Sequence, residues 1–304
     1  MTSSKEIVLP VKREKRITVL ISGSGTNLQA LLDASNSSIL PGRITHVISS
    51  RSKAYGLIRA SSQNPPIPTT IIALKTFLSR NPGSTREDYD VEVARLVLTN
   101  KPDLVVLAGW MHILSDSFLD ILNGVREAPS APTSSSPKPE SSNTQTEPIP
   151  SVFDGETDTT FSFNQETEIG TLPLSSLGED IIDSLSRRAT IAMASKREKE
   201  EIENYQGEIY FPIPIINLHP ALPGAFDGAN AIGRAYEAFQ KGEINKTGVM
   251  VHRVVREVDR GEPLVVREIE MRVGESQEEL EKRIHEVEHE IIVEGAKKVL
   301  EGLT

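Results

Sequence analysis

The chain has no cysteine, which excludes both a disulfide framework and a thiolate metal site. It has no apolar run near the ~18 residues that span a bilayer, and its N-terminal stretch MTSSKEIVLPVKREKR lacks the apolar segment of a secretory signal. It is also short of positive charge: the formal net charge is −10, whereas a nucleic-acid-binding surface is basic. We therefore expect a soluble, cytoplasmic protein without a membrane or nucleic-acid partner. Binding of small anions stays open, because a local site can be electropositive in an acidic protein.

The residues that are present suit a folded core. Of the 304 residues, 38% are hydrophobic and 25% are charged, which is near the average for globular proteins. Strand-like runs without polar alternation are separated by helical segments, a pattern that predicts an α/β fold with a mostly parallel sheet covered on both faces. We expect strands at residues 17–22, 44–50, 69–74 and 102–110, and helices at residues 28–34 and 86–100, the second with Val91, Ala94, Leu96 and Val97 on its apolar face.

A long segment of different composition interrupts this pattern. Residues 126–160 are rich in Pro, Ser, Thr and acidic residues, which cannot bury enough apolar surface to offset the entropy of ordering. Residues 172–206 could carry one or two helices. We predict an insertion over residues 126–206, largely disordered, between two halves of one domain at residues 15–125 and 207–304.

The second half is expected to hold both helices and strands. The expected elements are a helix at residues 230–242, a pair of strands at residues 247–255 and 263–271, and a final helix at residues 276–303 that buries Leu280, Ile284, Val287 and Ile291.

The stretch SGSGTN, Ser22 to Asn27, lies between the first strand and the first helix. Ligands of open α/β sheets bind at such carboxyl ends, and glycines let backbone N–H groups approach an anion at a helix N-terminus. A tight turn without a ligand is the alternative. Leu28 stands where the third glycine of a dinucleotide fingerprint belongs, and no GK[ST] follows, so a phosphate monoester fits better than NAD or ATP.

The stretch HEVEH, His285 to His289, matches the zinc-protease pattern H-E-x-x-H. Such a match arises easily by chance on a helix rich in Glu and His. No further histidine follows His289 as a third ligand. We therefore expect no metal here, and interpret these residues as a solvated helix edge, part of which could line a pocket.

The stretch NLHPALPG carries the strongest chemical signal. Asn217 and His219 are two residues apart at a strand end, so their side chains point to the same side. An amide donor beside an imidazole suits a reaction that develops charge on a carbonyl oxygen. Asp259 lies on a loop after a later strand, and a carboxylate that reached His219 would raise its pKa and orient its ring.

Several stretches together resemble the phosphoribosylglycinamide formyltransferase family, the folate-dependent enzymes of purine synthesis. The similarity runs, in order, through ITVLISGSGTNLQALLDA, REDYD, DLVVLAGWMHILS, INLHPALPG and GVMVHRVVREVDRGEPLV, and into the last helix. It covers about two-thirds of the chain, all outside residues 126–206. The resemblance implies a Rossmann-like formyltransferase fold and transfer of a formyl group from 10-formyltetrahydrofolate, a co-substrate, to the amine of 5′-phosphoribosylglycinamide.

The resemblance also implies roles for particular residues. Asn217, His219 and Asp259 match the family's catalytic trio. In the first half, the phosphate-binding one, Gly25, Thr26 and Asn27 match the positions that bind the substrate phosphate. On the last helix, Glu288 matches the residue that binds the ribose hydroxyls, and His285 a neighbouring substrate-side position.

Folate contacts are implied at Arg86 and at Met111, His112, Ile113 and Leu114, with Asn217 shared between the two substrates. Many relatives carry an arginine at the position of His112, which leaves the contact to the folate tail open there. The second half is then the catalytic and folate-binding half. No metal is implied, and the expected state is a monomer or a weak homodimer.

The sequence leaves three alternative functions open. A formyltetrahydrofolate hydrolase would use water in place of the amine and would carry an additional N-terminal regulatory domain. A methionyl-tRNA formyltransferase would need a basic RNA-binding region. A catalytically silent folate-binding or scaffold protein would act through the insertion, and the presence of all three trio residues argues against it.

Overall fold

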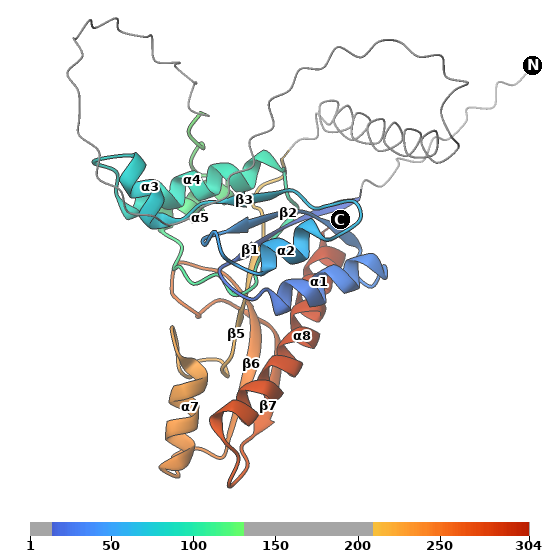
Figure 1. The fold of residues 1–304 in the computed structure, drawn as a ribbon, viewed down its shortest axis with the longest axis vertical. Helices are drawn as coiled ribbons and strands as arrows, with labels where there is room; N and C mark the ends of the chain where they lie inside the picture. Colours follow the sequence, from blue (N-terminus) through green and yellow to red (C-terminus); the bar gives the residue numbers. More distant parts are fainter. Residues whose placement is uncertain (1–13, 131–208, 304) are drawn as a thin grey trace, which may run out of the picture. The chain divides into compact units, whose positions relative to one another are not determined.

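The computed structural model describes residues 14–130 and 209–303 (Figure 1). In these residues, seven strands form one sheet in the order β3-β2-β1-β4-β5-β6-β7. The strand pairs from β3 to β5 are parallel, and the pairs β5–β6 and β6–β7 are antiparallel. The strands are Lys15–Ile21 (β1), Gly42–Ser49 (β2), Thr69–Ile71 (β3), Leu104–Leu107 (β4), Ile215–His219 (β5), Lys246–Arg253 (β6) and Pro263–Glu270 (β7).

Helices cover both faces of this sheet, which confirms the predicted mostly parallel α/β architecture. Helices α1 and α8 pack on one face, and α4 and α5 on the other (Figure 1). The described helices are Thr26–Asn36 (α1), Gly56–Ser61 (α2), Leu74–Arg80 (α3), Arg86–Thr99 (α4), Asp116–Leu122 (α5), Ala231–Gln240 (α7) and Gln277–Gly302 (α8).

Two predicted boundaries were wrong. The strand predicted at residues 69–74 ends at Ile71, because Leu74 already begins α3. The strand predicted at residues 102–110 is only four residues long, Leu104–Leu107. Gly109 follows with φ 79°, a left-handed conformation that no strand residue adopts. The short helices α2, α3 and α5 were not predicted at all.

The apolar face of α4 also differs from its prediction. Ala94 and Val97 are buried as expected, but Val91 and Leu96 are only partly buried. Tyr89 is fully buried instead, and its hydroxyl donates to the Ile72 carbonyl at 2.9 Å. A polar group can occupy a core position in this way because its hydrogen bond is made there.

The last helix is as predicted in its main part. Leu280, Ile284 and Ile291 are fully buried, whereas Val287 is partly buried. The neighbouring buried position belongs to Glu288, whose carboxyl group is discussed below.

The predicted insertion lies outside the described residues from position 131 to its end. The chain that precedes it and the chain that follows it are joined by the sheet, because β4 pairs with β5 in the register Val105↔Ile215. The Ile213 N–H also donates to the Leu122 carbonyl at 2.9 Å. In the part of the chain that the structure describes, none of the helices combines the length and apolar character needed to cross a membrane.

Candidate functional site

A cavity of about 750 Å³ lies at the carboxyl ends of β1, β4 and β5. This is the edge where open α/β sheets bind ligands, and the volume is within the usual range for small-molecule sites. The cavity is lined by residues 23–27, 107–114, 217–220, 228–232 and 254–259, with His252, Glu281, His285 and Glu288. All of the predicted site residues except Arg86 line it.

The SGSGTN turn forms one wall and begins α1. Gly25 has φ 71°, a left-handed conformation that favours glycine, and the helix starts at Thr26. A Cβ added at Gly25 would lie 2.6 Å from the Gly56 Cα, so this glycine also permits α2 to approach the turn. The exposed N-terminus of α1 thus faces the cavity, as an anion site requires.

Asn27 and Glu288 bring the first and last helices together beside that turn. The Asn27 amide donates to Glu288 Oε2 at 3.1 Å, and the amide oxygen of Asn27 has no partner in the part of the chain that the structure describes. Glu288 is 5% exposed, and burial raises its pKa although Asn27 and the charge of His285 lower it. The pair presents an acceptor and a carboxyl group to a ligand that carries hydroxyl groups.

The segment Met111–Leu114 forms another wall, next to the SGSGTN turn. The Met111 N–H donates to Ser22 Oγ at 3.0 Å, and Arg86 Nη2 donates to the Ile113 carbonyl at 2.5 Å. Arg86 therefore fixes the shape of this wall from outside the cavity. The side chains of Met111 and Ile113 are 66% and 65% exposed, which leaves apolar surface for a flat ligand.

His112 lies edge-on between two aromatic rings. Its ring centroid is 5.3 Å from that of Trp110 and 5.8 Å from that of Tyr89. Burial lowers the pKa of His112, and the positive charges of Arg86 and Arg51 lower it further. The ring is therefore mostly neutral at pH 7, unlike an arginine at the same place.

The three predicted catalytic residues meet around one carboxylate. Asp259 Oδ1 accepts from the Asn217 amide at 3.3 Å, and Oδ2 lies 3.5 Å from His219 Nδ1. The Gly228 N–H donates to Oδ2 at 2.8 Å. The side chains of His219 and Asp259 are only 5% and 9% exposed, so these contacts are shielded from water.

A fourth residue of this cluster, His252, was missed in the sequence. Its Nε2 lies 3.4 Å from Asp259 Oδ1 and 3.3 Å from the Asn217 amide nitrogen, while Nδ1 donates to the Arg253 carbonyl at 2.8 Å. The antiparallel register pairs Asn217 with His252. Its position late in the predicted strand TGVMVHRVV, just before the loop that carries Asp259, was the feature of the sequence that could have indicated it.

Asp259 raises the pKa of His219, as expected of a nearby carboxylate, but the pKa of this ring is still lowered overall. Burial lowers the pKa of His219 and outweighs the charge of Asp259, which raises it. The Phe226 carbonyl, which accepts from His219 Nε2 at 3.2 Å, raises it as well. For Asp259, burial acts to raise the pKa, but hydrogen bonds from His252 and Gly228 and the charges of the two histidines bring it to about 2.

No group of three or more His, Cys, Asp or Glu side chains within residues 14–130 and 209–303 is arranged to hold a metal ion. His285 and Glu288 of the HEVEH stretch both face the cavity just described.

Comparison with known proteins agrees with this geometry. The family model described as formyl transferase matches residues 15–125 and 209–295, more than half of the chain. The phosphoribosylglycinamide formyltransferase of Schizosaccharomyces pombe is 33% identical over 287 residues, covering 93% of this chain and 96% of that protein. Its counterpart in Saccharomyces cerevisiae is 33% identical, covering 95% of this chain and 98% of that protein.

Solved structures of similar proteins share the fold of this chain. The crystal structure of glycinamide ribonucleotide transformylase 1 from Symbiobacterium toebii superposes with a TM-score of 0.59 at 25% identity, covering 95% of this chain and 89% of that one. The phosphoribosylglycinamide formyltransferase of Bacillus halodurans, at 21% identity and a TM-score of 0.57, shares the fold.

Proposed function

The chain belongs to the phosphoribosylglycinamide formyltransferase family, and on that premise we propose which of its residues carry out the reaction. The enzyme transfers a formyl group from 10-formyltetrahydrofolate to the amine of 5′-phosphoribosylglycinamide in purine biosynthesis. The observation that carries the proposal is the meeting of Asn217, His219 and Asp259 inside one cavity large enough for small-molecule substrates.

The reaction exchanges one carbon–nitrogen bond for another. The substrate amine attacks the formyl carbon, and the carbonyl oxygen takes negative charge in the tetrahedral intermediate. The bond from carbon to N10 of the folate then breaks, the amine loses a proton and N10 gains one. The protein must therefore stabilise an oxyanion and move a proton.

Asn217 and His219 supply these two functions. Asn217 Nδ2 lies 3.3 Å from both Asp259 Oδ1 and His252 Nε2, so one of its two N–H groups turns from His252 to the oxyanion when the substrates are bound. His219 stabilises the developing charge and transfers the proton. A preorganised donor in a site shielded from water is worth about two to three orders of magnitude in rate.

Asp259 and His252 position these groups. Asp259 accepts from Asn217 and lies beside His219, so it fixes the relative placement of both. His252 acts through Asp259 and Asn217 and is a positioning residue.

The two substrates contact different parts of the cavity lining. Backbone N–H groups of Gly25, Thr26 and Asn27 bind the phosphate, and Glu288, with His285 beside it, binds the ribose hydroxyls. The segment Met111–Leu114, which includes His112, binds the folate, and Arg86 supports this segment through the Ile113 carbonyl. In this proposal the charge is stabilised by side chains, so no step uses a metal.

The remaining proposals concern the cellular context. We infer that the enzyme works in the cytoplasm on small molecules alone, as a monomer or a weak homodimer. Sedimentation velocity at micromolar concentration distinguishes these states from a tight oligomer, whose observation would contradict this inference.

A single assay tests the function and the residue roles. Loss of the folate formyl group is followed spectroscopically with and without the ribonucleotide substrate, for the wild type and for Asn217→Ala and His219→Ala. We expect turnover only with the ribonucleotide, and a loss of about two to three orders of magnitude in each variant. Turnover without the ribonucleotide would indicate a hydrolase, and unchanged rates in the variants would contradict the assigned roles.

A further inference from the structure

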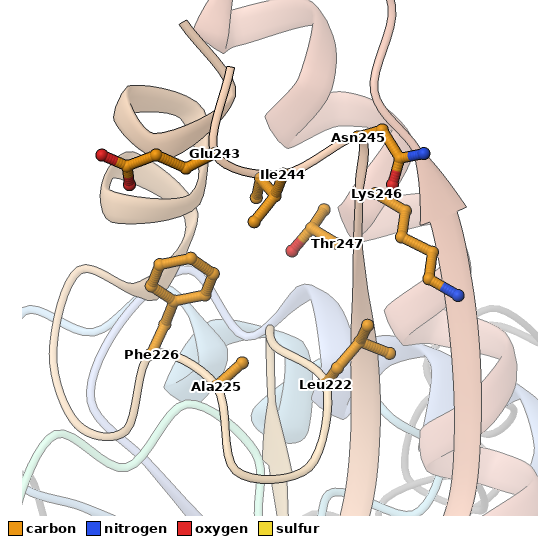
Figure 2. Close-up of a pocket in the computed structure, with 8 residues that line it drawn as sticks. All are labelled: Leu222, Ala225, Phe226, Glu243, Ile244, Asn245, Lys246 and Thr247. Carbon is orange, nitrogen blue, oxygen red and sulfur yellow. The ribbon is translucent and has the colours of Figure 1, made fainter. Parts of the chain in front are cut away.

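A second cavity, of about 290 Å³, lies on the far side of the loop that follows β5. Leu222, Ala225 and Phe226 of that loop form one wall, and Ile244 and Thr247, at the turn from α7 into β6, form the other (Figure 2). The volume equals that of about ten liquid water molecules at ~30 Å³ each. It is at the lower limit of known ligand pockets, so only a small ligand fits.

The charged groups at this cavity are directed away from its interior. Figure 2 shows the side chains of Glu243, Asn245 and Lys246 pointing outward. Lys246 Nζ is bound to Glu268 Oε1 at 2.7 Å on the neighbouring strand. The walls that face the interior are therefore apolar and uncharged, which favours a neutral ligand.

One polar group lies beside the interior without a hydrogen-bond partner among the described residues. Thr247 is 2% exposed, and its hydroxyl is buried. Figure 2 shows this hydroxyl directed between Ile244 and the loop residues. A buried polar group without a partner destabilises the fold, so a ligand that hydrogen-bonds to it gains more than it would from an exposed hydroxyl.

Phe226 connects this cavity to the catalytic centre. Its side chain lines the second cavity, and its carbonyl accepts from His219 Nε2 at 3.2 Å and from Arg234 Nη2 at 2.6 Å. Its backbone has φ 52°, a conformation that is strained for a bulky residue. A ligand that moves the Phe226 ring would therefore move the carbonyl that holds His219.

We propose that this cavity binds a small neutral molecule with an apolar body and one hydroxyl or amide group, and that its occupancy alters turnover through Phe226. The binding depends only on the cavity, whereas the effect on turnover rests on the function proposed above.

The probe is 4-methylphenol, with toluene as the matched probe that lacks the hydroxyl. Methyl NMR of the full chain follows Ala225 and Ile244 in the second cavity, and Ile113 in the catalytic cavity. Thr247→Val removes the hydroxyl at nearly constant shape. Thr18→Val is the control, because Thr18 is also a buried strand threonine whose hydroxyl has no partner in residues 14–130 and 209–303, but it does not line this cavity.

We expect saturable shifts at Ala225 and Ile244, and binding weakened about fivefold or more by Thr247→Val and by the use of toluene, but not by Thr18→Val. At saturation, the formyl-transfer rate should change in the wild type and in Thr18→Val. Thr247→Val should melt no lower than the wild type, because it loses only an unpartnered group.

Absence of saturable shifts at Ala225 and Ile244, or binding that is indifferent to Thr247→Val, would overturn the proposed site. Binding without any change in the transfer rate would overturn the coupling through Phe226. If the unliganded chain transferred no formyl group at all, the proposed function would fail while the binding result stood.

Discussion

At the scale of single residues, Asp259 has the largest influence on the site. Its carboxylate contacts Asn217, His219 and His252 and accepts the Gly228 N–H. It also adopts φ 55°, a conformation that Asp tolerates better than most residues do. The charge and the place of this one group therefore affect every side chain proposed to be catalytic.

Asp259→Asn keeps the size of the side chain and removes its charge. The charge of Asp259 raises the pKa of His219 against burial, so the variant should lower that pKa further. We expect turnover to fall by at least ~100-fold, with little change in ribonucleotide affinity. The limb of the pH–rate profile that depends on His219 should move toward acid.

Asp227→Asn serves as the matched control. The charge of Asp227 also raises the pKa of His219, but this carboxylate is paired with Arg260 at 2.5 Å and does not contact the ring. The control should show a smaller shift in the same direction and near-normal turnover. An unmoved profile and normal turnover in Asp259→Asn would separate Asp259 from His219.

His46 is predicted to make stability depend on pH. Burial lowers its pKa to about 4, and its ring nitrogens bond Asn100 and Thr70 at 2.6 and 2.8 Å. The folded state thus keeps His46 neutral at a pH where the unfolded chain, with a pKa near 6.5, already binds a proton. Stability should be complete above pH 6.5 and fall by about 3 kcal/mol as the pH drops toward 4.

Urea unfolding at several pH values measures this dependence. His46→Leu should be less stable at neutral pH, because Asn100 and Thr70 lose a partner. Its free energy of unfolding should nevertheless depend less on pH, because about one proton fewer is bound on unfolding across that range. An identical pH dependence in the wild type and the variant would assign the effect to other groups.

From the sequence, Asn217, His219 and Asp259 were expected to lie together, but His252 beside them was not. Asn217, His219 and Asp259 lie in short motifs whose order along the chain is itself informative. His252 reaches them only because β6 runs antiparallel to β5, and its relevance depends on a register that single-sequence periodicity does not contain. The overall direction of the His219 pKa could not be predicted for a similar reason, because burial depends on the whole fold.

At the scale of elements, two helices begin with the same capping box but at different distances from the site. Thr85 and Asp88 cap α4, and Ser276 and Glu279 cap α8. Arg86, which donates to the Ile113 carbonyl in the Met111–Leu114 wall of the cavity, directly follows the first cap. The capping box of α4 therefore also supports the residue that holds the Ile113 carbonyl, whereas the capping box of α8 does not.

Thr85→Ala and Ser276→Ala should each lower the free energy of unfolding by about 1 kcal/mol. Only Thr85→Ala should also raise the KM for the formyl folate, because it loosens Arg86. Denaturation and steady-state kinetics on both variants check this. Equal KM values in the two variants would show that Arg86 does not depend on its helix cap.

Strands and long helices were predicted better than short helices. Strand β1 is an almost continuous apolar run and helix α8 has strong helical periodicity over 26 residues, so local pattern and tertiary packing agree. Helices α2, α3 and α5 are six or seven residues long, too short for periodicity to appear. Tyr89 was missed because its burial depends on one hydrogen bond to a distant carbonyl.

At the scale of the whole molecule, the ordered ends on either side of the predicted insertion lie side by side. The Ile213 N–H donates to the Leu122 carbonyl, and a Cβ added at Gly124 would lie 2.8 Å from Phe211 Cγ. The family model stops at residue 125 and resumes at residue 209. A short connection is therefore long enough to join the two described parts.

Replacing residues 127–160 with a short Gly/Ser linker should leave kcat within a few-fold of the wild-type value. The site residues all lie outside this segment, and the strands β4 and β5 that join the halves are untouched. Kinetics and the melting temperature of the shortened chain test this. A collapse of both would show that the segment holds part of the fold in place.

The loop between β6 and β7, by contrast, should not tolerate a change in length. Asp259 must reach His219, His252 and Gly228 at once, and a Cβ at Gly261 would lie 1.6 Å from the Arg253 carbonyl. One inserted or deleted residue would carry the carboxylate out of reach without changing a single catalytic side chain. Among descendants of this gene, gaps should therefore gather between residues 126 and 208 and avoid residues 254–262, so that the number of residues in one hairpin is inherited as strictly as the identity of a catalytic group.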